Sequence, residues 1–256
     1  MLLVHGAWHT GKAWNGVAAR LRAHGVAVAV AELHRDSLAG DVAAAEAALD
    51  GIAGSGPVVA CGHSYGGAVI SGLPPSKVAH LVYLAAMMPD VGETSFGLLA
   101  QAPPSDLGAC MVGDVAGTTT IDPARAGGLF HGQLEADRRS RHVAELVPQV
   151  MAAGHQAAVT AAWRSRPSTY VRCTDDRVVH PELQRRFTRR ATHTVTWRSD
   201  HGAFASHESD TAALLARLAR RCAAQCVDAR PVGVDGQASG STSGCVNRTG
   251  LPSDRA

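Results

Sequence analysis

The stretch PVVACGHSYGGAVI, residues 57–70, determines the fold that we predict for this chain. Residues 57–61 are almost wholly apolar, as expected of a strand buried on both faces, and residues 65–73 fit a helix. Between them, Gly62-His63-Ser64-Tyr65-Gly66 fits the pattern G-x-S-x-G. A tight turn of this kind strains the backbone at the serine and pushes its hydroxyl out above the sheet edge, beside a helix N-terminus that favours negative charge. This context predicts that Ser64 is a nucleophile.

Strand-like and helix-like segments alternate on both sides of this stretch, which favours a doubly wound α/β fold with about six mostly parallel strands. The other expected strands are residues 2–4, 26–33, 78–86, 168–173 and 192–197, and the other expected helices are residues 14–24, 41–52, 181–190 and 208–224. Residues 89–163 contain two helical patches and no clear strand, and are expected to form an inserted helical cap. We therefore predict one domain over residues 1–225, followed by a disordered low-complexity tail at 226–256.

A serine nucleophile needs a base and an orienting acid, which follow it in this kind of fold in the order acid, then histidine. Asp175 and Asp176 come directly after the strand at 168–173, and His201 comes after the strand at 192–197. The carboxyl ends of parallel strands meet at one edge of the sheet, where ligands bind. Neighbouring side chains on an extended segment point to opposite sides, so only one of the two carboxylates can orient His201. Asp200 is expected to face solvent.

An oxyanion hole is predicted in the loop after the first strand, His5-Gly6-Ala7-Trp8. The amide of Ala7 is expected to be one donor and the amide of Tyr65 the second. Losing one such donor costs about 3 kcal/mol in other acyl-transfer enzymes. We expect His5 and His9 to anchor this loop. Trp8, Met87 and Met88 either line an apolar pocket or pack in the core.

Composition excludes several other classes of function. A formal charge of +2 indicates neither nucleic-acid nor membrane binding, so a small-molecule substrate is expected. The six cysteines form no disulfide framework or metal-ligand pattern, and we predict no metal or organic cofactor. Met1 leads directly into Leu2-Leu3-Val4 without a signal-peptide pattern, which predicts a cytoplasmic location. Nothing in the sequence indicates the oligomeric state.

These motifs together resemble the α/β-hydrolase superfamily, in particular the branch of plant methylesterases (the salicylate-binding esterase type), hydroxynitrile lyases and their bacterial relatives. The matching segments are residues 5–9, 62–67, 83–89, 173–177 and 200–201. The resemblance covers residues 1 to about 220 and is weakest in the cap. It implies an α/β-hydrolase fold and favours Asp176 as the acid, although the family commonly has Thr-Glu-Asp where this chain has Thr174-Asp175-Asp176.

The predicted activity is hydrolysis of a small or apolar carboxylic ester through an acyl-enzyme, with Ser64, Asp176 and His201 as the triad. One alternative is a lyase or C–C bond hydrolase that uses the same triad. The resembling hydroxynitrile lyases carry a Thr in the oxyanion loop and a Lys after the catalytic His, where this chain has Ala7 and Gly202. The other alternative is a ligand-binding protein of the same fold without catalysis.

Overall fold

The computed structural model describes residues 1–228 apart from 35, 53, 55 and 114–116. The predicted disordered tail, residues 226–256, lies outside the described residues except for positions 226–228, which belong to the last helix. No helix in the described part of the chain is both long enough and apolar enough to cross a bilayer.

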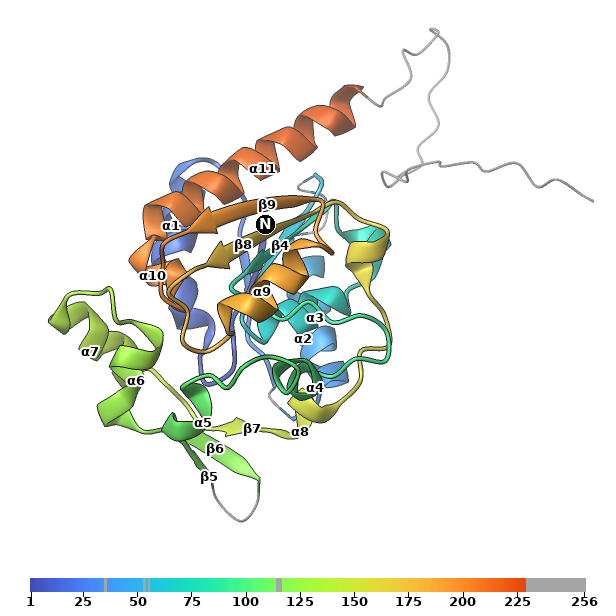
Figure 1. Cartoon of the computed structure of the whole chain (residues 1–256). Coiled ribbons are helices and arrows are strands. Elements are labelled where there is room, and N and C mark those ends of the chain that lie inside the picture. The colour runs from blue at the N-terminus through green and yellow to red at the C-terminus, as the bar shows by residue number, and fades with distance from the viewer. Residues whose placement is uncertain (35, 53, 55, 114–116, 229–256) are drawn as a thin grey trace, which may run out of the picture.

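A sheet of six parallel strands forms the centre of the molecule (Figure 1), as the strand and helix alternation predicts. Its spatial order is β2 (Ala29–Ala31), β1 (Leu2–Val4), β3 (Val59–His63), β4 (His80–Leu84), β8 (Ser168–Cys173) and β9 (His193–Trp197). β3 and β4 are buried along their whole length. Alternate residues of one strand belong to different cores: Leu2 and Val4 pack into one apolar cluster, and Leu3 packs into the other. The near-continuous apolar runs in the sequence follow from this burial on both faces.

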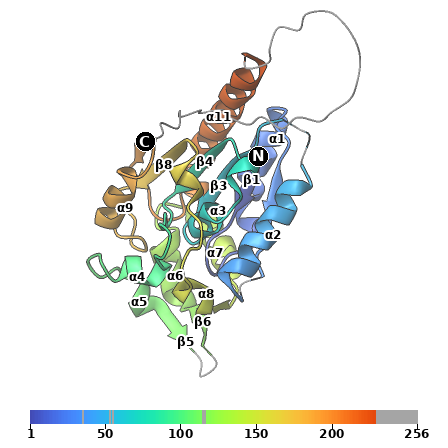
Figure 2. The same ribbon diagram turned by 90° about the vertical axis from the view of Figure 1, so that its right-hand side faces the viewer.

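Helices cover both faces of the sheet (Figure 1 and Figure 2), and each face has its own apolar core. One face carries α2 (Leu38–Asp50), α3 (Gly66–Ser71) and α9 (Pro181–Thr188), and the other carries α1 (Asn15–Ala23), α10 (Ala203–Ser206) and α11 (Glu208–Asp228). The α2 helix begins at Leu38 because the Ser37 side chain accepts a hydrogen bond from the Gly40 amide, which caps the first turn. Short 3-10 helices lie at Gly11–Trp14, Pro75–Lys77 and Ala162–Arg164.

The segment between β4 and β8 forms the cap that the sequence predicts, but one expectation about it is wrong. It contains the helices α4 (Ser95–Leu99), α5 (Leu107–Cys110), α6 (Pro123–Phe130), α7 (Ala136–Ala144) and α8 (Ala152–His155). It also contains an antiparallel sheet of β5 (Met111–Gly113), β6 (Thr118–Ile121) and β7 (Gln149–Val150), where we expected no strand. These strands have between two and four residues, which is too short for an alternating pattern to stand out in the sequence.

Candidate active site

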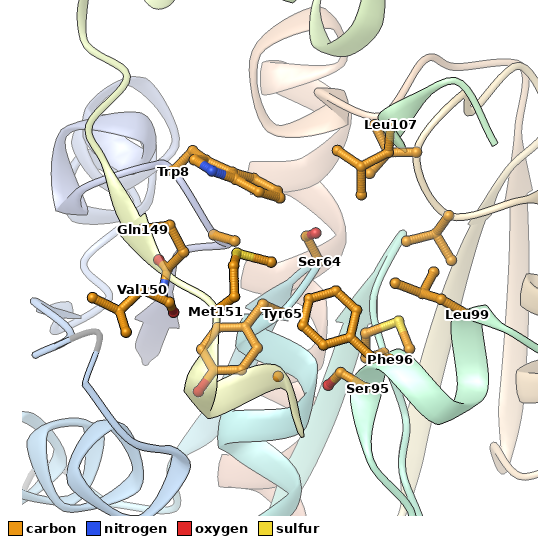
Figure 3. Close-up of a pocket in the computed structure, with 15 residues that line it drawn as sticks. Trp8, Ser64, Tyr65, Ser95, Phe96, Leu99, Leu107, Gln149, Val150 and Met151 are labelled. Atoms are coloured by element: carbon orange, nitrogen blue, oxygen red, sulfur yellow. The ribbon is translucent and has the colours of Figure 1, made fainter. Parts of the chain in front are cut away.

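Ser64 lies in the sharp turn between β3 and α3, and its backbone is in the left-handed region with a φ of 53°. This conformation costs a non-glycine residue about 1–3 kcal/mol, and such strain concentrates at functional sites. Close packing around the turn requires the flanking glycines. A Cβ on Gly62 would lie 2.3 Å from the Gly66 carbonyl oxygen, and a Cβ on Gly66 would lie 2.6 Å from the His5 carbonyl oxygen. The turn presents the Ser64 side chain to a pocket (Figure 3).

The structure brings His201 and Asp176 together from the loops that follow β9 and β8. Their Nδ1 and Oδ2 atoms are 2.9 Å apart, and both residues are buried. Asp176 Oδ1 accepts hydrogen bonds from the amides of Val178 and Val179, at 2.7 and 3.0 Å. Gln184 Nε2 of α9 donates to Oδ2 at 2.8 Å. These hydrogen bonds compensate for the burial of the carboxylate and leave Oδ2 directed at the imidazole.

Asp175 points away from this pair, as the alternation of side chains along an extended segment requires. Its carboxylate is on the surface, 3.4 Å from the Arg198 guanidinium Nε. Of the two neighbouring carboxylates, Asp176 is the one that contacts His201 in the structure. In the described structure Ser64 Oγ makes no hydrogen bond with His201. Such contacts are often loose without substrate and tighten in the reacting complex.

The loop after β1 lies beside the sharp turn that carries Ser64, residues 62–66, which we call the elbow. Ala7 and Tyr65 line the same pocket as Ser64. Trp8 has a φ of 60°, which marks a tight turn directly after Ala7. The His9 ring contacts the Ala7 carbonyl through Nδ1 at 2.8 Å, and the His5 ring contacts the Gly6 carbonyl at 2.9 Å. Both imidazoles are thus directed at the loop's own backbone, in the anchoring role that we expect for them.

The pocket in front of Ser64 is apolar and is closed partly by the cap (Figure 3). It contains about 520 Å³ of space between atoms, part of it open to solvent. Of the three residues for which the sequence left pocket lining and core packing open, Trp8 and Met87 line the pocket and Met88 is buried in the core. The cap contributes further walls, which include Phe96, Leu99, Leu107, Val150 and Met151. No Asp, Glu, Lys, Arg or His is among the residues that line it, so the pocket suits a neutral, apolar group.

Behind the elbow, four imidazoles gather between the sheet edge and the cap. His63 and His9 come from the sheet edge, and their ring centroids are 5.9 Å apart. His131 of the cap lies 6.0 Å from His9 and 4.9 Å from His142. Burial lowers the pKa of His9 to about 3 and that of His131 to about 2, and it holds the pKa of His63 well below its usual value. These rings are therefore neutral around pH 7.

Hydrogen bonding is incomplete in this histidine cluster (His9, His63, His131 and His142). Within the described residues, neither ring nitrogen of His131 has a partner, and one nitrogen of His9 and one of His63 also lack one. His63 Nε2 lies 2.9 Å from the carbonyl oxygen of His201. A carbonyl only accepts, so His63 is the Nε2–H tautomer and donates this bond. The residue before the nucleophile thus holds the backbone of the histidine that contacts Asp176.

The sequence analysis missed three features of the site, and one expectation was wrong. Gln184 and His63 hold Asp176 and His201, but nothing in a single sequence marks a polar residue as a buried hydrogen-bonding partner. The cap segment around Gln133 also reaches the His201 loop. Asp200 does not face solvent: it is 5 % exposed and accepts hydrogen bonds, because the cap covers it.

The parallel sheet, the strained elbow and the cap define a class of protein, the α/β hydrolases. The sequence profile of the "Alpha/beta hydrolase family" matches residues 1–218, and the chain belongs to this family. This confirms the predicted fold class and the resemblance on which the prediction partly depended.

Individual relatives agree with this assignment. The chain is similar to a "Carbendazim hydrolyzing esterase" from Nocardioides sp., with 35 % identity over 126 residues, 44 % of this chain and 52 % of the relative. The match therefore spans about half the length of that protein. A solved pyrethroid hydrolase from Sphingobium faniae has a TM-score of 0.71 and 22 % identity, covering 86 % of this chain and 96 % of that one. Polyneuridine aldehyde esterase has a TM-score of 0.73 and 17 % identity, covering 85 % and 98 %. These two structures establish a shared fold.

Proposed function

We propose that this protein is a serine hydrolase that cleaves a neutral, apolar carboxylic ester through an acyl-enzyme. The observation that carries the proposal is the His201–Asp176 hydrogen bond of 2.9 Å beside a serine in left-handed backbone geometry. The names of the relatives support it, since those proteins are described as an esterase of carbendazim, a hydrolase of pyrethroids and an esterase of polyneuridine aldehyde. Their named substrates differ, so they support the ester-cleaving class and leave the substrate of this chain open.

In the proposed first half-reaction, Ser64 Oγ attacks the ester carbonyl carbon while His201 Nε2 takes its proton. The carbonyl oxygen becomes negative and accepts hydrogen bonds from the amides of Ala7 and Tyr65. Asp176 fixes the imidazole with its proton on Nδ1 and stabilises the imidazolium that forms. Collapse of the tetrahedral intermediate breaks the ester C–O bond, and the leaving alkoxide takes the proton from His201. In the second half, a water attacks the acyl-enzyme with the same base and releases the acid.

The lyase alternative receives no support from the space beside His201. The resembling lyases carry a Lys directly after the catalytic His, where this chain has Gly202. A Cβ on Gly202 would lie 2.3 Å from His131 Nδ1 and 2.6 Å from the Phe130 carbonyl oxygen. A lysine could enter only if this part of the cap moved. The non-catalytic alternative leaves the buried pair of Asp176 and His201 without a role.

The experiment that tests the proposal is Ser64→Ala, assayed with nitrophenyl esters of graded acyl length. We expect turnover to fall by about 10³-fold or more, because only the oxyanion donors and binding remain. Ser209→Ala, an exposed serine on α11, is the matched control and should keep wild-type turnover. Ester hydrolysis that survives in Ser64→Ala would show that another group is the nucleophile.

A further inference from the structure

One segment of the cap, residues 130–133, forms hydrogen bonds with the loop that carries His201, residues 198–202, on both sides of the histidine. On one side the backbone amide of Gln133 donates to Asp200 Oδ2 at 2.9 Å. On the other side the Gly202 amide donates to the Phe130 carbonyl oxygen at 2.7 Å. The two bonds flank His201 in the chain, and so its backbone cannot shift without breaking one of them. The loop and the cap segment come from distant parts of the sequence, which makes this contact a feature of the tertiary fold.

Asp200 is the side chain of the loop that takes part in this contact, and the Gln133 side chain adds a longer bond, from Nε2 to the Arg198 carbonyl oxygen at 3.3 Å. Its second oxygen, Oδ1, accepts a hydrogen bond from the Ser206 hydroxyl of α10 at 2.9 Å. The carboxylate is 5 % exposed, and burial raises its pKa, while the Gln133 amide, the Ser206 hydroxyl and His201 oppose that rise. A buried carboxylate is costly unless it accepts hydrogen bonds, and these two donors supply them. One side chain thus ties the cap, the His201 loop and α10 together.

The loop and the cap segment are also closely packed against each other. The Phe130 and His201 ring centroids are 5.9 Å apart. Gly202 has no room for a side chain, since even a Cβ would approach His131 Nδ1 to 2.3 Å. His201 is therefore contacted from three sides: by Asp176, by His63 of the elbow, and by the cap segment.

We propose that Asp200 is a positioning residue, which ties the His201 loop to cap segment 130–133 and so holds the imidazole in line with Ser64. This inference depends on the proposed function, in which His201 is the base. The cap would then have two roles, since the insertion that lines the pocket also holds the loop of the base. Misplacing a catalytic group by about 1 Å can cost about 10²-fold in rate.

The test compares Asp200→Ala with Asp200→Asn by measuring kcat and KM on one nitrophenyl ester. The asparagine can keep both ties: Oδ1 accepts from the Gln133 amide, and the Ser206 hydroxyl rotates to accept from Nδ2 and to donate to the Gly202 carbonyl, 3.4 Å away. We expect Asp200→Ala to lower kcat about 10- to 100-fold with KM nearly unchanged. Asp200→Asn should stay within about threefold of wild type in kcat, because it keeps both hydrogen bonds.

Two further variants make the test decisive. Gly202→Ala displaces the cap segment without changing any charge, so kcat should fall with KM nearly unchanged. Asp50→Asn removes an exposed carboxylate at the end of α2, away from this loop, and should leave kcat and KM unchanged. A folded Asp200→Ala enzyme with wild-type kcat overturns the inference, and so does an Asp200→Asn enzyme as slow as Asp200→Ala, since charge alone would then act. If His201→Ala keeps full activity, the proposed function fails, and this inference fails with it.

Discussion

The carboxyl edge of the sheet and the cap differ in what they supply to the site. The edge supplies the candidate reacting groups, because the loops after β1, β3, β8 and β9 carry Ala7, Ser64, Asp176 and His201. The cap supplies apolar walls, such as Phe96 and the residues around it. Parallel strands all end at the same edge, so regular secondary structure fixes the edge. The cap is a single insertion of short elements. We therefore expect the sheet edge to determine the type of reaction and the cap to contribute most to the choice of substrate.

The largest effect that would test this division is expected at the sheet edge, in Asp176→Asn. Asp176 Oδ1 accepts two backbone amides, and Oδ2 accepts from Gln184 Nε2 and lies 2.9 Å from His201 Nδ1. An asparagine must place its NH₂ group at one of these positions, where it meets donors. Turnover of a nitrophenyl ester should fall by about 10⁴-fold, as when other triads lose the orienting acid.

A second variant tests the same site: Gln184→Glu keeps the size of the Gln184 side chain but adds a second buried carboxylate beside Asp176. Like charges at this distance favour protonation of one of the pair, so turnover should fall with a strong dependence on pH. An Asp176→Asn enzyme that keeps more than about a tenth of wild-type turnover would contradict the triad and return the choice of acid to its neighbour.

The next effect concerns the boundary between the two regions, where the histidine cluster lies. The folded pKa values of His9 and His131, about 3 and about 2, are below the value of about 6.5 expected for an unfolded chain. Between these values the unfolded state binds more protons than the folded state. Stability is therefore fully present above about pH 6.5 and is lost as the pH falls toward 3, by up to about 1.4 kcal/mol per pH unit for each histidine.

Urea denaturation between about pH 7.5 and about pH 4.5 measures this slope. His131→Leu removes a buried ring with two unpartnered nitrogens, so it should flatten the slope and raise the free energy of unfolding at the acid end. His24→Gln, an exposed histidine after α1, is the control and should leave the slope unchanged. Equal slopes in all three proteins would mean that the cluster is hydrated and titrates as free histidines do.

A smaller effect is expected in the cap, from Phe96→Ala. The Phe96 ring lines the pocket and packs against His155, with ring centroids 4.5 Å apart. Removing it enlarges the pocket by most of a phenyl ring. KM for short acyl esters should rise about 5- to 10-fold, while longer acyl chains lose less because they fill the space, and kcat should change little.

Steady-state kinetics on acetyl, butyryl and octanoyl nitrophenyl esters give this comparison. Val159→Ala, a residue 84 % exposed after α8, is the control and should bind all three as the wild type does. A loss in kcat that is equal for all chain lengths would mean that Phe96 supports the reacting groups, and the division between edge and cap would not hold there.

The sequence predicts the sheet edge better than the cap, because the edge depends on local patterns and the cap depends on long-range contacts. The elbow requires glycines on both sides of Ser64 and a buried strand before it, and these requirements are local and visible. The burial of Asp200 depends on Gln133, a residue far away in the chain, so no local pattern indicates it. The strands of the cap are too short for periodicity, and β6 with four residues is the longest of them. Long-range contacts of this kind become visible only once the chain is folded.

The smallest effect is expected for Asp175→Asn, and it tests the sequence argument about adjacent carboxylates. Asp175 and Asp176 differ by one position, but their side chains leave the chain on opposite sides. The Asp175 carboxylate is 43 % exposed and contacts Arg198, whose side chain is 90 % exposed. Surface ion pairs contribute about 0–1 kcal/mol, so turnover should fall less than about fivefold. Parallel assays of the two asparagine variants on one ester decide the point, because a severe loss at Asp175 with a mild one at Asp176 would reverse the assignment of the acid.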